Sequence, residues 1–182
     1  MRGSKRRRDP LPLDSAKLDE LALTYVGRFA TTRAKLGSYL SRKIRERGWS
    51  GERAPDPERI VERLATLGYV DDAQYALSKA RSLSGRGYGP RRVCQSLHAA
   101  GIGEEDGEAA QVFAGEESVA AALRYARRRR IGPFAAETAD AATRERTLAA
   151  MIRAGHSFGI SKAILGLRPG ADVDIEMLEE KS

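Results

Sequence analysis

The chain has 182 residues, of which 41% are hydrophobic and 6% aromatic, and its 32 basic and 25 acidic side chains give a formal net charge of +7. A single cysteine excludes an internal disulfide, and one cysteine with two distant histidines excludes a Cys/His zinc cage. No apolar run reaches the roughly 18–20 residues of a membrane span. We therefore expect a cytoplasmic protein without metal or cofactor. Its basic surface suits a polyanion or an acidic protein partner, and solubility alone is the alternative explanation of the charge.

Positive charge is concentrated in a few segments. Residues 1–8 carry five basic side chains and no acid, and residues 73–101 carry five more without an acid. Residues 1–14 are predicted to form a disordered basic leader, because like charges repel and nothing apolar is available to bury. No apolar segment follows the leader, so it does not resemble a secretory signal.

Three helices are predicted in the first third of the chain. The first covers residues 15–29, where apolar side chains up to Phe29 share one helical face. The second opens at Thr31 or Thr32 and is closed by Gly48. The third has Asp56 as its N-cap, places Leu67 toward the core, and is stopped by Gly68.

The same order of helices then restarts twice. Helices are predicted over about 72–84, 90–100 and 104–114, and again over about 116–130, 141–154 and 157–165, with Ile152 facing the core. Gly48, Gly101 and Gly155 each end the middle helix of a round. No segment alternates β-branched with polar residues. The pattern predicts an all-α fold of three tandem three-helix modules, about nine helices in an elongated, curved array. The modules span residues 15–69, 70–114 and 115–168, and an acidic tail covers 169–182.

No constellation of residues typical of an enzyme is found. The segment Gly85–Gly89 follows a helix and lacks the spacing of a dinucleotide-binding loop, so it is interpreted as a turn that needs positive φ. Cys94 and His98 could form a nucleophile–base pair, but a partly buried helical cysteine is the preferred interpretation. Asp71 and Asp72 are interpreted as helix caps rather than a catalytic carboxylate pair. His156, at a helix junction, is expected to be structural.

Two local strings are more specific than the composition. The first is Leu-Ala-Thr-Leu-Gly-Tyr-Val-Asp-Asp-Ala-Gln-Tyr-Ala at residues 64–76. The second is Arg-Gly-Tyr-Gly-Pro-Arg-Arg-Val at residues 86–93, followed by Leu97 and by Gly101-Ile102. The order of these two strings and the distance between them along the chain resemble the motifs of the RecX family, bacterial regulators of the RecA recombinase. A weaker match lies at residues 151–158, where His156 stands in place of the usual phenylalanine.

The resemblance covers roughly residues 15–168 and implies an all-α chain of three three-helix modules. It also implies a non-enzymatic protein that binds the RecA–single-stranded DNA filament in its deep groove. Such a protein usually restrains RecA filament growth, ATP hydrolysis, strand exchange and co-protease action in DNA repair and the SOS response. The family offers no catalytic residues to carry over.

The candidate residues fall into two groups. Contacts with the filament or with DNA are expected from exposed basic side chains and one tyrosine: Arg28, Arg33, Lys79, Arg86, Tyr88, Arg91, Arg92, Arg127, Arg128, Arg129 and Arg130. Architectural roles are expected for Gly68, Tyr69, Asp71, Asp72, Tyr75, Gly89, Pro90 and Gly101. Tyr69 and Tyr75 are predicted to pack between modules. For Tyr88, stacking on a base or partner and packing in the core both remain open.

Two other classes of function stay open beside regulation of RecA. A nucleic-acid-binding module would use its helices on phosphates without RecA, and a structural scaffold would bind neither. We expect the partners to be the RecA filament, with single- or double-stranded DNA as a further candidate, no membrane, and a monomeric chain.

Overall fold

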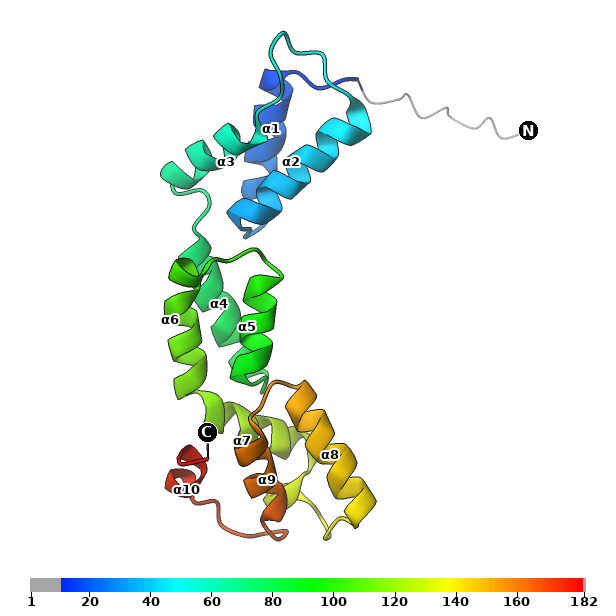
Figure 1. Ribbon diagram of the computed structural model, residues 1–182, viewed down its shortest axis with the longest axis vertical. Helices are drawn as coiled ribbons and strands as arrows, with labels where there is room; N and C mark the ends of the chain where they lie inside the picture. Colours follow the sequence, from blue (N-terminus) through cyan, green and yellow to red (C-terminus); the bar gives the residue numbers. More distant parts are fainter. Residues whose placement is uncertain (1–10, 182) are drawn as a thin grey trace, which may run out of the picture. The chain divides into compact units, whose positions relative to one another are not determined.

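The computed structural model describes residues 11–181 and shows an all-α protein (Figure 1). Among these residues there are ten α-helices, one short 3-10 helix and no strand. A single isolated bridge joins Leu13 to Trp49. The predicted fold class is therefore confirmed. The chain divides into two compact units, Met1–Asp72 and Ala73–Ser182.

The first unit contains α1 (Ser15–Val26), α2 (Arg33–Arg47) and α3 (Pro57–Thr66). Each helix begins where a side chain accepts a hydrogen bond from an otherwise unpaired backbone N–H. Asp14 serves α1, Thr32 serves α2, and Asp56 serves α3. The core of the unit includes four leucines of these helices: Leu18, Leu36, Leu40 and Leu64.

The prediction of a disordered leader over residues 1–14 is wrong for residues 11–14. Residues 1–10 lie outside the described residues, but Leu13 is fully buried in the core of the first unit. Its backbone N–H donates to the carbonyl of Gly48, and its carbonyl accepts from the N–H of Ser50. Residues 11–14 are therefore not disordered, because an apolar side chain and two backbone hydrogen bonds fix them.

Two side chains predicted to face this core are exposed. Phe29 is 56% exposed and Leu67 is 63% exposed. Helix α1 ends at Val26, with Gly27 as its C-cap, and α3 ends at Thr66. Both residues therefore lie beyond the helix end, where the 3.6-residue period no longer sets the direction of a side chain.

The second unit begins with α4 (Asp72–Gly85), whose first residue is the last of the first unit. It continues with α5 (Pro90–His98) and α6 (Glu104–Glu116). These helices enclose a core rich in small residues, including Ala76, Ala80, Ala110 and Ala114. Because alanine side chains occupy little volume at the contact positions, these helices can approach one another closely.

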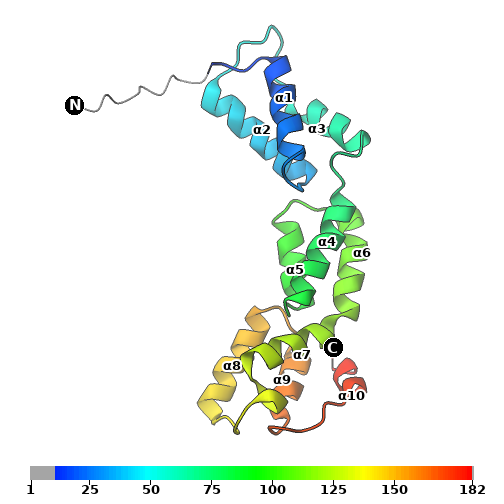
Figure 2. The same ribbon diagram turned by 180° about the vertical axis from the view of Figure 1, so that it is seen from behind.

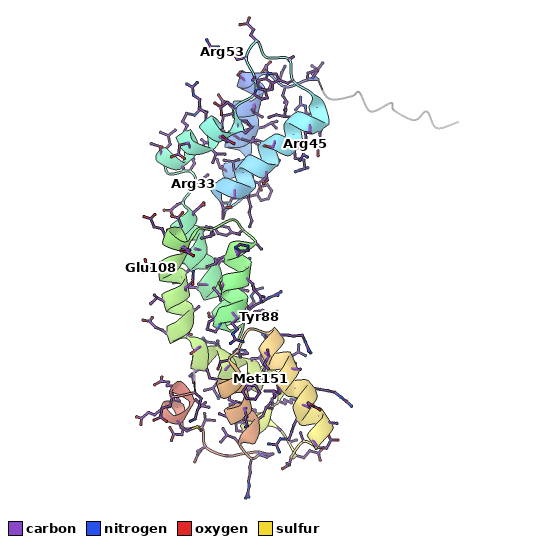
Figure 3. The ribbon with its side chains drawn as sticks, in the orientation of Figure 1. Arg33, Arg45, Arg53, Tyr88, Glu108 and Met151 are labelled. Carbon is purple, nitrogen blue, oxygen red and sulfur yellow. The ribbon has the colours of Figure 1, made fainter. Side chains whose placement is uncertain are left out.

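The remaining helices of the second unit enclose another cluster. They are α7 (Ser118–Arg129), the 3-10 helix η1 (Gly132–Phe134), α8 (Ala141–Arg153) and α9 (Phe158–Gly166). Met151, labelled in Figure 3, is fully buried in this cluster. Ile152, predicted to be buried, is at the exposed side of α8 because it follows Met151 by 100° of helical rotation.

The acidic tail contains a tenth helix that periodicity did not reveal. Helix α10 (Ile175–Glu179) packs on α9 and α7 (Figure 2). Leu178 is fully buried in the same cluster as Met151, and the carbonyl of Lys181 accepts a hydrogen bond from the Ser157 hydroxyl. The described residues form three hydrophobic clusters in two units. The division into three modules stays a prediction.

Replacing Leu178 by alanine is expected to destabilise the second unit. The change removes a fully buried side chain and leaves a cavity, which typically costs about 2–4 kcal/mol. The matched control is Ile175→Ala in the same helix, because Ile175 is 53% exposed. Thermal unfolding followed by circular dichroism tests the difference. Equal melting temperatures for the two variants would show that α10 contributes nothing to the core.

Candidate functional site

The turn between α4 and α5 lies against the turn between α8 and α9. The N–H of Gly89 donates to the carbonyl of Ala154 at 2.9 Å, and the N–H of Arg91 donates to the carbonyl of Gly155 at 3.2 Å. These two turns hold the most specific part of the sequence, residues 86–93, and the weaker match at residues 151–158. We call this contact the junction.

Glycine is required at the junction because the two backbones touch. A Cβ atom on Gly89 would lie 2.3 Å from the carbonyl oxygen of Gly155, and a Cβ on Gly155 would lie 2.4 Å from the nitrogen of Arg92. Gly87 has a φ of +80° and lies against the backbone of Tyr125. The positive φ expected in this turn is confirmed at Gly87. Gly89 instead has a φ of −81°, so its role is to allow close approach.

His156 is buried inside the junction. Its Nε2 lies 3.1 Å from the carbonyl oxygen of Gly87, so this nitrogen donates the hydrogen bond and carries the proton. Its ring meets Tyr125 edge-on, with centroids 5.4 Å apart. Nδ1 is buried without a hydrogen-bond partner among the described residues. The structural role expected for His156 is confirmed.

The junction is expected to weaken when the protein is acidified. Burial lowers the pKa of His156 below its ordinary value of 6.5, and the hydrogen bond to Gly87 opposes that shift in part. Because the folded-state pKa is the lower one, the unfolded chain binds more protons below pH 6.5. Stability is therefore fully present above about pH 6.5 and decreases below it, by at most about 1.4 kcal/mol for each pH unit.

Denaturant unfolding between pH 7 and pH 5 tests this expectation. His156→Phe should remove most of the pH dependence, whereas His98→Gln should retain it because His98 is exposed. An unchanged pH profile in the His156 variant would contradict the assignment.

Four exposed arginines border the junction. Arg91 and Arg92 occupy the first turn of α5, where their backbone N–H groups are hydrogen-bonded and their side chains are exposed. Arg128 donates to the carbonyl of Arg86 at 2.5 Å, which brings the end of α7 beside the turn. No ion pair involves any of the four within residues 11–181. We call Arg86, Arg91, Arg92 and Arg128 the junction patch.

Tyr88 lies within the same turn (Figure 3). It is half-buried and packs against both clusters of the second unit, while the Arg86 guanidinium lies 5.7 Å from its ring centroid. Of the two alternatives left open by the sequence, core packing is therefore the one observed. The tyrosine supports the position of Arg86 by a cation–π contact.

The four consecutive arginines at the end of α7 do not share one face. Arg127 lies over Phe134 at 5.0 Å, whereas Arg128 reaches Arg86. Arg129 and Arg130 border a hollow beside α8, and Arg130 ends the helix in the left-handed conformation, with a φ of +55°. Each residue of a helix is rotated by 100° from the last, so a charge run distributes around the axis.

The other predicted contact residues are not part of the junction turns. Lys79 is half-buried on α4. Arg28 and Arg33 are exposed residues of the first unit. The N–H of Arg33 donates to the Asp72 carboxylate at 2.9 Å, so Asp72 satisfies a free donor at the start of α2. Asp72 is therefore the first residue of α4, and its side chain also accepts a hydrogen bond from the first residue of α2.

The two tyrosines among the architectural candidates differ in exposure. Tyr69 is 58% exposed, whereas Val70, which follows it, is buried, and Gly68 before it has a φ of +76°. Tyr75 is half-buried against the core of α4–α6, and the packing of either tyrosine between modules stays a prediction. Pro90 occupies the first turn of α5, and Gly101 ends that segment with a φ of +74°.

Cys94 is exposed, not partly buried as predicted. It borders an open hollow of about 620 Å³ between α5 and α6, together with His98 and three glutamates, Glu104, Glu105 and Glu108. Within the described residues, no group of three or more His, Cys, Asp or Glu side chains could hold a metal ion. No helix formed by these residues has the length and hydrophobicity needed to cross a membrane.

Sequence reasoning missed four arginines that the fold brings together with Arg129 and Arg130. They are Arg144, Arg146 and Arg153 of α8, and Arg168, which follows α9. The one available signal was the spacing of Arg146 and Arg153, seven residues apart on one helical face. Glu145 lies between Arg144 and Arg146 and offsets part of their positive charge, so the sequence did not mark this segment as basic.

Comparison with known proteins gives concordant results. A family model described as RecX, second three-helix domain, matches residues 71–110. The regulatory protein RecX of Myxococcus xanthus is 34% identical over 177 residues, which cover 92% of each chain. That of Mycobacteroides abscessus is 35% identical over 100 residues, or 54% of this chain and 47% of its own.

Solved structures share the fold. The crystal structure of RecX from Lactobacillus salivarius has a TM-score of 0.59 and 20% identity, covering 82% of this chain and 93% of that one. A second crystal structure of regulatory protein RecX has a TM-score of 0.58 and 25% identity, and the match covers 82% of this chain and 70% of that one. With a relative of more than 30% identity along nearly its whole length, this chain belongs to the RecX family of regulatory proteins.

Proposed function

We propose that this protein is a non-enzymatic regulator of RecA that binds the RecA–single-stranded DNA filament in its groove and inhibits it. The observation that carries the proposal is the 34% identity to a regulatory protein RecX over 92% of both chains. Inhibition would act on RecA ATP hydrolysis, filament extension, strand exchange and co-protease activity.

The junction patch is the surface that we propose for contact with the filament. Its arginines are exposed and free of intramolecular ion pairs among the described residues, so binding would not first break a salt bridge. The turns beneath them are fixed by backbone hydrogen bonds across the junction. Arginines held on a rigid support lose less conformational entropy when they bind carboxylates or phosphates.

Occupation of the groove would inhibit RecA only through a difference in affinity. A ligand shifts a conformational equilibrium when it binds one state more tightly than the other. We propose that the patch binds a subunit arrangement that hydrolyses ATP slowly or cannot accept a further subunit. Contacts from several helical segments in one chain would add, because each later contact is intramolecular.

A binding experiment distinguishes this function from RecA-independent binding of DNA. Fluorescence anisotropy of the labelled protein would be measured with single-stranded DNA alone, and with the same DNA coated by RecA and a nonhydrolysable nucleotide. The proposal predicts much tighter binding to the coated DNA at physiological salt. Equal binding with and without RecA, decreasing steeply as salt rises, would support a nucleic-acid module and contradict a filament regulator.

A further inference from the structure

The strongest unassigned feature of the second unit is a pair of adjoining hollows along α8. One has a volume of about 390 Å³ and the other about 410 Å³. They share Arg129, Ile131, Thr143 and Thr147 in their linings, so they adjoin one another, and we call the two together the α8 groove. It is framed by the end of α7, by α8 and by the segment after α9.

Six arginines line the α8 groove: Arg129, Arg130, Arg144, Arg146, Arg153 and Arg168. All six are exposed, and one acidic residue, Glu137, lines the groove with them. Within the described residues, none of the six forms an ion pair with a carboxylate. Like charges gathered without partners raise the local positive potential, which an anionic ligand would neutralise.

The shape of the α8 groove favours a polymer over a single small anion. Arg146 and Arg153 are separated by seven residues of α8, which is about 10 Å along the helix axis. Arg168 and Arg130 line the other hollow, beyond Thr143 and Thr147. A ligand that meets all these side chains must therefore carry several negative charges along its length.

The residue types favour phosphate as the repeated anion. All six basic side chains are arginine, whose planar fork of donors matches phosphate oxygens in pairs, and no lysine lines the groove. The one aromatic lining residue, Tyr125, is buried beneath Arg128 and Arg129 and has no face free for stacking on a base. A ligand would be held by its backbone, with its bases directed away from the protein.

We propose that the α8 groove binds the sugar–phosphate backbone of single-stranded nucleic acid, without sequence preference. This site is separate from the junction patch, and binding there does not require RecA. It adds a direct contact with the nucleic-acid strand to the regulation proposed above. The two sites share no residue, so each can be altered by itself.

The test compares two triple variants in fluorescence anisotropy with labelled single-stranded oligo(dT). The groove variant carries Arg144→Gln, Arg146→Gln and Arg153→Gln. The control carries Arg45→Gln, Arg53→Gln and Arg59→Gln, which removes the same charge from exposed positions of the first unit. We expect the groove variant to bind at least about tenfold more weakly at low salt. Its slope of log K against log salt should be shallower by about two, at about 0.7 for each lost contact.

Three results with these variants would overturn the proposal. The groove variant could match the native protein in affinity and slope, or the control could lose as much affinity as the groove variant. Alternatively, the groove variant could lose affinity for polyglutamate and retain affinity for oligo(dT), which would assign the groove to an acidic protein segment.

A measurement on the native protein keeps the test independent of folding. Phenylglyoxal modifies exposed arginines, and mass spectrometry identifies the modified positions. Oligo(dT) should protect Arg144, Arg146 and Arg153 while Arg45, Arg53 and Arg59 remain reactive. Equal modification with and without oligo(dT) would contradict the site. Binding to RecA-coated DNA, measured in parallel, reports separately on the function proposed for the junction patch.

Discussion

Replacing Gly155 by alanine should lower the stability of the second unit by about 4 kcal/mol or more, among the largest effects of a single added methyl group. Two costs combine at this position. The φ of +96° is one that a side chain rarely adopts, which costs about 1–2 kcal/mol. The added Cβ would also lie 2.4 Å from the backbone nitrogen of Arg92. The junction would have to separate to admit it.

Gly170→Ala is the matched control for this substitution. Gly170 has a similar conformation, with a φ of +76°, lies in the same unit, and has no atom within 4 Å of the Cβ position. It should therefore show the conformational cost without the clash. Differential scanning calorimetry should give a melting temperature lower by about 10 °C or more for Gly155→Ala, and lower by only a few degrees for Gly170→Ala. Equal shifts would show that the junction is not closely packed.

Reversing two charges of the junction patch, Arg91→Glu with Arg92→Glu, should weaken binding to the RecA filament by at least about tenfold, or about 1.4 kcal/mol. If the junction patch contacts the filament as proposed, each substitution would remove a charge-assisted hydrogen bond and place a negative charge against an anionic surface. Both side chains are exposed, and the atoms that join the junction are their backbone atoms and the Cβ of Arg92, which glutamate retains, so folding should be unaffected.

The control for this variant is Arg45→Glu with Arg53→Glu, which makes the same change of charge in the first unit. Binding to RecA-coated single-stranded DNA and the melting temperature would be measured for both. A melting temperature well below that of the native protein would show that Arg91 and Arg92 are structural. Binding equal to that of the control would remove the junction patch from the interface.

The helices were predictable because their ends carry local chemical signals. Asp56 before Pro57, and Ser157 before α9, mark helix starts by capping, and Gly48, Gly101 and Gly155 all have positive φ where helices stop. Periodicity failed where it was extended past the last residue of a helix, as at Phe29 beyond Val26 and at Leu67 beyond Thr66. It also missed α10, since a five-residue helix with one buried leucine offers no period to recognise.

The candidate functional site was predictable only in part, because its geometry depends on contacts between residues that lie far apart in the sequence. The local sequence of Gly85–Gly89 correctly predicted a turn, but the need for glycine at position 89 comes from Gly155, on another turn. Arg91 and Arg92 could be identified as exposed basic residues, whereas the α8 groove joins arginines from three segments of the fold. Their shared surface exists only once those segments pack together.

The measurement that tests the central claim most directly is ATP hydrolysis by RecA on single-stranded DNA, with this protein titrated into the reaction. Hydrolysis should decrease at well below one molecule of this protein for each RecA. The Arg91→Glu, Arg92→Glu variant should require at least about tenfold more protein for the same decrease. Hydrolysis that remains unchanged at one protein for each RecA, with the single-stranded DNA fully coated, would contradict a role in regulating the filament.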